Sequence, residues 1–549
     1  MILKVFKNKK YIINFYYIIF FGTLLSIGIS SYKDFGIHID ELYSRFLGLV
    51  SLNYVSNFLF PNFIFDFQTN NDLPDLNTFF WKANSVSYEL LLVIFENILN
   101  IEKINNIIFF RHLTNFLFFF TSNIAFFFTI KILYKNNFLS SVGTLFLFFS
   151  PRIFANSFYN SKDLIFLSLI IISLFFLVKI LKKLTYKRIL FFSIFSAFSI
   201  GTRILGIYIP FLFIIFYFLV CLQKEGYFLN TYKYLIFFIL SICFFTVLFW
   251  PFLWESPLNN LIYSFKFYSQ FPMDFDIFYL GDFINSNFVP WHYPLVWIFV
   301  TTHPGIIFFF LIGFFSILVR FVKRFILIND KSNVNDIWMG NNEKINLFLL
   351  LCFLIPLTLV ISLNFVLYND WRILYFVFPF MVLISLYGIN FLLITNPIKK
   401  INIVIKIIPI LFIFTNIYNV IIFHPFQNTY FNYFFEKKAN SMFVIDYFGL
   451  GNLETLQKII SLNPNKKKIT VGLKSMANLN DTKEMLNQAD KDRLLITGPD
   501  VSGQDFIFTN YYYEYNPILT DKYMIPKNYK KVFSLKRGNI IINELYMKK

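Results

Sequence analysis

The chain has 549 residues, of which 57% are hydrophobic, 22% aromatic and only 15% charged, and its formal net charge is +18. Its mean hydropathy is +0.59. A water-soluble domain of ordinary composition carries about 25% charged residues. These values argue against a soluble globular enzyme, a disordered chain, a coiled coil and a disulfide-stapled scaffold, and they indicate an integral membrane protein.

The cysteines and the positive charge narrow the class further. Cys221, Cys243 and Cys352 lie inside apolar runs, without the spacing of a metal site or a disulfide framework. The net charge alone would suggest nucleic acid as a partner. Most of the lysines, however, lie in short connections between apolar segments, where they act as topology signals. We therefore expect no nucleic-acid partner.

Apolar runs define the predicted membrane spans, because a spanning helix needs about 20 predominantly apolar residues. The first run follows several lysines, but it is longer than the roughly 7 to 15 apolar residues of a secretory signal. We expect it to be an uncleaved first span. Eleven spans are predicted, at residues 11–31, 107–131, 138–154, 163–181, 189–202, 204–222, 232–254, 296–320, 346–366, 373–396 and 401–423.

The charges of the connections alternate along the chain, and basic connections are expected in the cytoplasm. The basic connections contain Lys4, Lys7, Lys9 and Lys10, then Lys131 and Lys135, then Lys179, Lys182, Lys183, Lys187 and Arg188, then Lys224 and Lys233, then Arg320, Lys323 and Arg324, and last Lys399 and Lys400. The acidic or mixed connections, expected outside, contain Asp34, Asp40, Glu41, Asp66, Asp72 and Asp75, then Glu255, Asp274, Asp276 and Asp282, and last Asp370.

The stretch 189–222 has two interpretations, because only Gly201, Thr202 and Arg203 interrupt it. One long span or two short ones would both fit its length. Lysines flank both ends, which favours a hairpin that returns to the same side. With eleven spans the C-terminal 125 residues lie outside the cell, and with ten they would lie in the cytoplasm.

The residues after about Phe434 are polar and predict a small α/β domain outside the membrane. Its predicted elements are a helix near 452–462, strands at 468–473 and 505–510, and a hairpin at Arg537-Gly538-Asn539 between strands 531–535 and 540–545. The predicted division is a membrane domain over 1–432, with a first outer loop at about 32–106, and a soluble domain over 433–549. No internal repeat is evident, which counts against a transporter built of two similar halves.

The first outer connection is the most informative segment. It reads Asp34-Phe35-Gly36-Ile37-His38-Ile39-Asp40-Glu41-Leu42-Tyr43-Ser44-Arg45, directly after the first span. A merely solvated polar loop would look similar. The functional interpretation is that one carboxylate serves as a general base towards an acceptor. If the segment is helical, Asp40 and Glu41 point about 100° apart, so they cannot share one task.

A second polar cluster connects the third and fourth predicted spans, from Ser150 to Asp163. Pro151 ends or kinks the helix, and Arg152, Asn156, Asn160, Lys162 and Asp163 follow within a dozen residues. The alternative is that Arg152 and Lys162 only extend to the interface. Cations on the side that the charge rule depletes favour an anionic ligand, because Arg binds phosphate bidentately and Lys binds it as a point charge.

The arginines and histidines are distributed unevenly between the two faces. Five of the ten arginines and all five histidines fall on the predicted outer side, namely Arg45, Arg111, Arg152, Arg203, Arg372, His38, His112, His292, His303 and His424. This predicts a polar cavity that opens outward. A charge inside the membrane costs about 2.5 to 3.5 kcal/mol on insertion scales, so we expect Arg203 to face that cavity. Any single histidine of this set is more often structural than functional.

These features together resemble the GT-C class of polyprenyl-phosphate-sugar glycosyltransferases, and most closely the branch of protein O-mannosyltransferases and aminoarabinose lipid A transferases. The resemblance is carried by Ile39-Asp40-Glu41, by the segment from Pro151-Arg152 to Asn160-Ser161-Lys162-Asp163, and by His424-Pro425-Phe426-Gln427-Asn428-Thr429-Tyr430-Phe431-Asn432. It covers most of residues 1–432. The class is defined more by its topology than by these short motifs.

The resemblance implies an inverting transfer of a sugar from a polyprenyl phosphate to an acceptor that is deprotonated by a first-loop carboxylate. Asp40 matches the catalytic position best, and Glu41 is the second choice. The implied phosphate ligands are Arg152, Lys162 and Arg203, and the further substrate contacts are Asn160, Asp163, His303 and Arg372. Some members of the class need a divalent metal, but His38 and one carboxylate are too few ligands to assign a metal here.

The expected partners are a polyprenyl-phosphate sugar donor, a lipid, glycan or protein acceptor, and membrane lipids. The expected location is a bacterial inner (cell) membrane, crossed many times, with the active site facing outward. Two alternatives stay open on the sequence: a lipid or polysaccharide transporter without enzymatic activity, and a ligase or polymerase of lipid-linked glycans.

Overall fold

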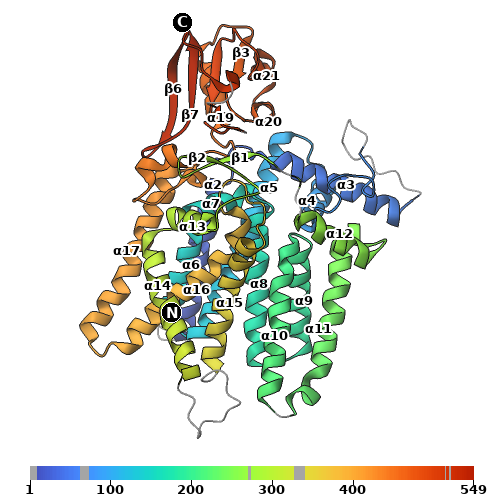
Figure 1. Cartoon of the computed structure of the whole chain (residues 1–549), viewed down its shortest axis with the longest axis vertical. Helices are drawn as coiled ribbons and strands as arrows, with labels where there is room; N and C mark the ends of the chain where they lie inside the picture. Colours follow the sequence, from blue (N-terminus) through green and yellow to red (C-terminus); the bar gives the residue numbers. More distant parts are fainter. Residues whose placement is uncertain are drawn as a thin grey trace, which may run out of the picture.

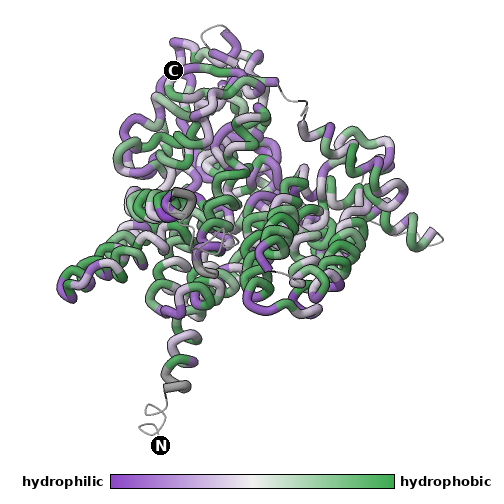
Figure 2. Tube along the Cα trace, turned by 60° about the horizontal axis from the view of Figure 1, so that its bottom comes forward, coloured by the Kyte–Doolittle hydropathy of each residue, from purple (hydrophilic) through white to green (hydrophobic). Residues whose placement is uncertain are grey.

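A computed structural model describes residues 9–61, 73–224, 226–269, 272, 274–326, 341–513, 515–517 and 521–549. Four of the loop charges named above, Lys4, Lys7, Asp66 and Asp72, lie outside these ranges. The described chain forms a helical bundle that carries a smaller sheet-containing domain at one end (Figure 1). The bundle is hydrophobic along its helices, and the polar residues gather at its ends and in the sheet domain (Figure 2).

Nine helices of the described residues are long and apolar enough to cross a membrane. They are α2 (Lys9–Ser31), α5 (Ile104–Tyr134), α8 (Asp163–Lys182), α10 (Tyr208–Gln223, after the 3-10 turn η1 at Ile204–Ile207), α11 (Tyr227–Phe249), α14 (Pro304–Ile326), α15 (Asn341–Ser362), α16 (Phe378–Thr395, after η3 at Arg372–Val377) and α17 (Lys399–Phe423). The chain is an integral, multi-pass membrane protein.

Two further segments complete the bundle. Helices α6 (Asn137–Phe148) and α7 (Pro151–Tyr159) pass the same test as a pair and are bent by 64°. The bend lies at Pro151, which has no N–H with which to continue the hydrogen bonds of α6. Helix α9 (Tyr186–Ile200) has only 15 residues and packs against α8 and α11. The predicted number of eleven spans is reached only if this short helix is counted.

The stretch 189–222 forms two helices, as the hairpin interpretation predicted. Helix α9 ends at Ile200, and α10 returns towards the end where Lys224 lies (Figure 1). The predicted span at 296–320 begins too early, because the chain is interrupted at Thr302 and His303 and the spanning helix follows this break. Helix α13 (Tyr293–Thr301) ends before this break, and α14 starts at Pro304, which suits the first turn of a helix.

Two glycines bring α14 and α16 into backbone contact. A Cβ atom added at Gly388 would lie 2.4 Å from the carbonyl oxygen of Phe309, and one added at Gly313 would lie 2.0 Å from the carbonyl oxygen of Ile384. Small residues permit this close approach of helices in a membrane. The contact fixes the height of α16 relative to α14.

The first outer loop contains two helices that the apolar runs did not predict, α3 (Glu41–Leu59) and α4 (Ser87–Ile98). They pack together and lie across the end of the bundle near α12 (Pro257–Ser269) (Figure 1). Strands β1 (Asp276–Tyr279) and β2 (Asp282–Asn285) form an antiparallel hairpin at the same end. The connections predicted to lie outside thus share this end with the sheet domain.

The C-terminal domain is a five-stranded sheet in the order β4-β3-β5-β7-β6. Strands β4 (Leu494–Thr497), β3 (Ile469–Leu473) and β5 (Phe506–Thr509) are parallel, and β7 (Ile540–Lys548) and β6 (Tyr529–Arg537) are antiparallel. Helices α19 (Asn452–Leu462), α20 (Leu479–Lys483) and α21 (Gln488–Arg493) complete it. The predicted helix near 452–462, the strands near 468–473 and 505–510 and the hairpin are confirmed, whereas β4 was missed.

The carboxyl ends of β3 and β5 face the membrane bundle. Met476 and Asn478 after β3, and Asn510 after β5, line a small void together with Ile37 and His38 of the first outer loop. The backbone N–H of Ile39 also donates to the carbonyl oxygen of Phe448 at 3.1 Å. The soluble domain therefore rests directly on the loop that carries the acidic pair.

Candidate active site

A cavity of about 160 Å³ lies between the end of the helical bundle and the C-terminal domain. Its walls come from four parts of the chain: the first outer loop with the start of α3, the connection between α7 and α8, the breaks before η1 and η3, and the segment before α19. The lining comprises His38, Asp40, Glu41, Tyr43, Ser44, Leu47, Trp81, Asn84, Tyr159, Asn160, Ser161, Lys162, Asp163, Arg203, Tyr368, Arg372 and Tyr447.

The acidic pair is split between the cavity and the protein interior. The side chain of Asp40 is 44% exposed, and Arg372 donates from Nη1 to its Oδ2 at 2.6 Å. Glu41 is buried, accepts the backbone N–H of His38 at 2.9 Å, and lies 3.1 Å from Nε2 of His112. Asp40 is therefore the carboxylate of the pair that faces the cavity.

Glu41 and His112 are both buried and lie against each other. On its other side, Nδ1 of His112 lies 3.2 Å from the carbonyl oxygen of Tyr32. These contacts hold the Glu41 side chain away from solvent.

Arg372 sets the protonation state of Asp40. Burial acts to raise the pKa of Asp40, but the charge and hydrogen bond of Arg372, together with the smaller effects of His38 and Lys162, lower the pKa to about 2. Arg372 itself is nearly buried and stacks on the rings of Tyr368, Tyr447 and Phe448. The ionised Asp40 side chain is thus held by a cation that is fixed between aromatic rings.

The connection between α7 and α8 supplies a second ion pair and a further cation. Asp163 pairs with Arg203, and it also accepts a hydrogen bond from Asn160 at 3.1 Å. Lys162 donates from Nζ to Oδ1 of Asn84 at 3.3 Å. Among the described residues, no carboxylate lies within ion-pair distance of Lys162. Burial lowers its pKa to about 8, so the ammonium is still mostly charged at pH 7.

Several buried donors of the cavity lining lack an acceptor within the described part of the chain. They are Nε2 of His38, Oη of Tyr159, Nε of Arg203 and Nε of Arg372. Nδ1 of His38 accepts the N–H of Asp40 at 2.9 Å, and burial lowers its pKa to about 4. The neutral ring therefore carries its hydrogen on Nε2, as a donor. A lining rich in unused donors suits a ligand rich in oxygen acceptors.

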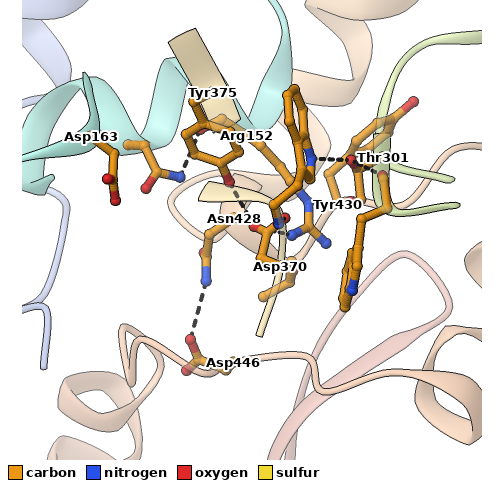
Figure 3. Close-up of polar contacts among 12 residues, drawn as sticks. Arg152, Asp163, Thr301, Asp370, Tyr375, Asn428, Tyr430 and Asp446 are labelled. Atoms are coloured by element: carbon orange, nitrogen blue, oxygen red, sulfur yellow. Dashed lines mark hydrogen bonds and ion pairs between the residues drawn. The ribbon is translucent and has the colours of Figure 1, made fainter. Parts of the chain in front are cut away.

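Arg152, which the sequence placed with Lys162 and Arg203, is used elsewhere. It donates to Asp370 at 2.6 Å and to the carbonyl oxygen of Tyr430 at 2.9 Å, and it stacks on Trp297 and Phe431. Figure 3 shows its guanidinium beside Asp370, near Tyr375 and Tyr430. Within the described residues it is not part of the cavity lining, because the buried Asp370 holds its charge.

His303 also lies outside the described cavity lining. Its Nδ1 accepts the N–H of Gly305 at 3.0 Å, and its Nε2 lies 2.8 Å from the hydroxyl of Thr415. Both ring nitrogens thus stabilise the start of α14 against α17. Asp40, Glu41, Asn160, Lys162, Asp163, Arg203 and Arg372 are the predicted site residues that the fold brings to one cavity.

Several lining residues were not given a role from the sequence, among them His38, Tyr159 and Tyr447. His38 is 3% exposed and lies between the rings of Tyr159 and Phe448. Tyr447 approaches Arg372, with 3.4 Å between Oη and Nη2. The position of His38 two residues before Asp40 was the available signal for it. Tyr447 joins the lining because the C-terminal domain packs against the bundle, and no local sequence pattern predicts that packing.

A buried ionic network supports the cavity from below. Arg111 of α5 pairs with Glu89 and Glu96 of α4, and Glu96 also accepts from Arg45 of α3 at 2.7 Å. Ser161, next to Lys162, donates to Glu89. The network ties α3 and α4 to the bundle and to the connection that carries Lys162.

The described residues contain no group of three or more His, Cys, Asp or Glu side chains arranged to hold a metal ion.

No protein family and no curated protein sequence matches the chain. The solved structures that are similar to it include two of ArnT from Cupriavidus metallidurans. The apo structure is 9% identical, with a TM-score of 0.47, and the match covers 88% of this chain and 86% of that chain. The structure bound to undecaprenyl phosphate is 10% identical, with a TM-score of 0.46, and covers 96% of this chain and 98% of that chain.

Proposed function

We propose that the protein is a glycosyltransferase that moves a sugar from a polyprenyl-phosphate donor to a lipid, glycan or protein acceptor on the outer face of the membrane. One observation carries the proposal. The exposed carboxylate of Asp40 and the ammonium of Lys162, which pairs with no carboxylate of the described chain, line the same cavity at the end of the membrane bundle. A base and a cation for the leaving group are the two groups that this transfer needs.

The donor phosphate is assigned to Lys162, with Arg203 beside it. A phosphate has only acceptor oxygens near neutral pH, which suits the unused donors of the lining. Arg203 keeps one unpartnered nitrogen, Nε, although Asp163 binds its Nη2. Asn160 and Asp163 act on the donor indirectly, by holding Arg203 and the connection in place.

The reaction is proposed as a single inverting displacement. An acceptor oxygen attacks the anomeric carbon, and the bond from that carbon to the phosphate oxygen breaks. The bonding electron pair leaves with the polyprenyl phosphate, whose charge Lys162 and Arg203 stabilise. The proton of the acceptor passes to Asp40, which must lie within hydrogen-bond reach of that acceptor.

Arg372 makes Asp40 a weak base until the substrates bind. An anionic substrate group that draws the guanidinium of Arg372 towards itself would release Asp40 and raise its pKa towards the usual range of a carboxyl group. The ion pair between Arg372 and Asp40 would then make the basicity of Asp40 depend on substrate binding.

The direct test is to incubate the purified full-length protein with defined polyprenyl-phosphate sugars and candidate acceptors. We expect acceptor-dependent release of polyprenyl phosphate and a product of inverted anomeric configuration. Release without any acceptor would indicate hydrolysis only. A retained configuration would contradict the single displacement.

If the protein is instead a lipid or polysaccharide transporter, substitution of the acidic pair should have a different effect. Transport by a cation-lined cavity would tolerate the double change Asp40→Asn and Glu41→Gln, whereas the proposed transferase would lose its activity. Movement of labelled lipid-linked sugar across vesicles, measured in the same variants, separates the two functions.

We place the cavity and the C-terminal domain on the outer side of a bacterial inner membrane. The positive connections at the opposite end of the bundle support this orientation. Reporter fusions after residue 226 and at Lys549 test it, with the first expected inside and the second outside. A cytoplasmic signal from the second fusion would overturn the placement.

A further inference from the structure

A second cavity, of about 560 Å³, lies at the end of the bundle farthest from the C-terminal domain (Figure 1). Its walls are the last residues of α5, α8, α14 and α16 together with the first residues of α15. Nothing in the proposed transfer uses it, because the whole length of the spanning helices separates it from Asp40.

The lining of this cavity carries excess positive charge. Three cations, Lys135, Lys182 and Arg320, face one carboxylate, Glu343. Arg320 lies 2.6 Å from Glu343 and neutralises it. Lys182 uses one of its donors on the carbonyl oxygen of Ile132 at 2.9 Å. Within the described part of the chain, no carboxylate pairs with Lys135 or Lys182, so their two charges can attract an anion.

One part of the remaining lining is apolar and exposed, beside the polar side chains of Asn346, Asn390 and Thr395. Ile394 and Phe391 of α16 and Leu133 of α5 belong to it, and Ile394 is 73% exposed. A soluble anion gains no binding free energy from apolar side chains. The acyl chain of a lipid does gain it, because burial of apolar surface is favourable. The position at the ends of spanning helices is the level of lipid headgroups.

We infer that this cavity binds an anionic phospholipid of the inner leaflet, with its headgroup phosphate between Lys135 and Lys182 and an acyl chain along Phe391 and Ile394. Basic pockets between membrane helices on the cytoplasmic side suit such headgroups. The site joins the ends of five helices, so an occupied site would stabilise the bundle.

The test uses the full-length protein in neutral detergent, with phosphatidylglycerol and phosphatidylcholine as probes and native mass spectrometry as readout. We expect phosphatidylglycerol to be retained in preference to phosphatidylcholine. The double variant Lys135→Gln/Lys182→Gln should bind it more weakly, by about fivefold for each lysine removed. Equal retention by this variant and by the original protein would overturn the inference.

A matched control removes charge from the same membrane face without touching the cavity. Lys399 and Lys400 are exposed at the start of α17, and Lys399→Gln/Lys400→Gln should leave binding unchanged. An equal loss in this variant would show that only the general surface charge matters, which contradicts a defined site.

A second variant and a second probe distinguish a lipid from a free anion. Ile394→Trp narrows the apolar wall and should weaken phosphatidylglycerol without altering any lysine. Inorganic phosphate should neither displace the lipid nor raise the unfolding temperature. Displacement by inorganic phosphate alone would overturn the assignment to a lipid.

Discussion

The guanidinium of Arg372 lies 2.6 Å from the carboxylate of Asp40, across 332 residues of sequence. The contact joins the 3-10 turn before α16 to the loop before α3. The ionisation and position of the Asp40 carboxylate therefore depend on where α16 holds Arg372.

The change Asp40→Asn should abolish sugar transfer. The variant keeps the shape of the side chain but cannot take a proton, and a general base contributes about 10²- to 10⁴-fold to rate. The measurement is the rate of polyprenyl phosphate release at saturating donor. Asp34→Asn is the matched control, since Asp34 lies in the same loop but pairs with His424. Full activity of Asp40→Asn would remove Asp40 from the mechanism.

Loss of Arg372 should shift the acid limb of the pH dependence of the transfer rate to higher pH. Asp40 is ionised above its pKa, so activity falls as the pH drops through that value. With Arg372 present the pKa is about 2, and in Arg372→Gln it should rise towards or above the ordinary 3.8, because the strongest effect that opposes burial is then lost. The pH dependence of the transfer rate, scaled to its own plateau, measures the shift. Arg493→Gln, on the soluble domain, should leave the limb in place.

Donor binding should weaken as the pH rises through about 8, where Lys162 loses its charge. Lys162→Gln should raise the KM for the donor by about 10- to 100-fold, the value of a charged hydrogen bond, and abolish this pH dependence. In Lys162→Arg the side chain should keep its positive charge to higher pH, so donor binding should persist there. Lys33→Gln, an exposed lysine of the first outer loop, is the control. A normal donor KM in Lys162→Gln would contradict the assignment.

His38→Phe should lower kcat/KM by about 5- to 100-fold while it leaves the fold intact. Phenylalanine fills the space between Tyr159 and Phe448 but has no donor to match the unpartnered Nε2 of His38, and such a bond contributes about 1 to 3 kcal/mol. Kinetics and thermal unfolding are measured together. A drop in the unfolding temperature without a kinetic effect would show that His38 only packs.

Arg111→Leu should destabilise the protein by about 3 to 5 kcal/mol, because it leaves the buried Glu89 without a cation and Glu96 with Arg45 alone. Thermal unfolding in detergent measures the loss. Adding Glu89→Gln and Glu96→Gln to this variant should restore much of the stability. If the combined variant is less stable than Arg111→Leu alone, the loss is one of packing and not of charge.

Much of the architecture follows from local sequence patterns. Apolar runs of about 20 residues locate most of the spans, and Pro151 marks the bend between α6 and α7, because both signals act within one or two helical turns. The elements that escaped prediction have weaker local signals. Helix α3 is only partly apolar, since it lies across the end of the bundle, and β4 has only four residues.

The candidate site was predictable in part for the same reason. Adjacent residues on a helix point apart, so the different surroundings of Asp40 and Glu41 follow from their spacing. The ion-pair partner of Arg152 cannot be predicted from spacing, because Asp370 lies 218 residues away and no periodicity links the two residues. Charge and predicted side placed Arg152 with Lys162, but only the packing of α7 against the later segments shows which carboxylate each cation meets.

The backbone contact between Gly313 and Gly388 makes catalytic geometry depend on a position deep in the membrane. Gly388 lies sixteen residues after Arg372, which corresponds to roughly 25 Å along the helix. Any larger side chain at residue 388 must push α16 away from α14 or slide it along its axis. Such a shift would carry Arg372 off Asp40, so a substitution with no polar atom could inactivate the site from the opposite half of the same spanning helix.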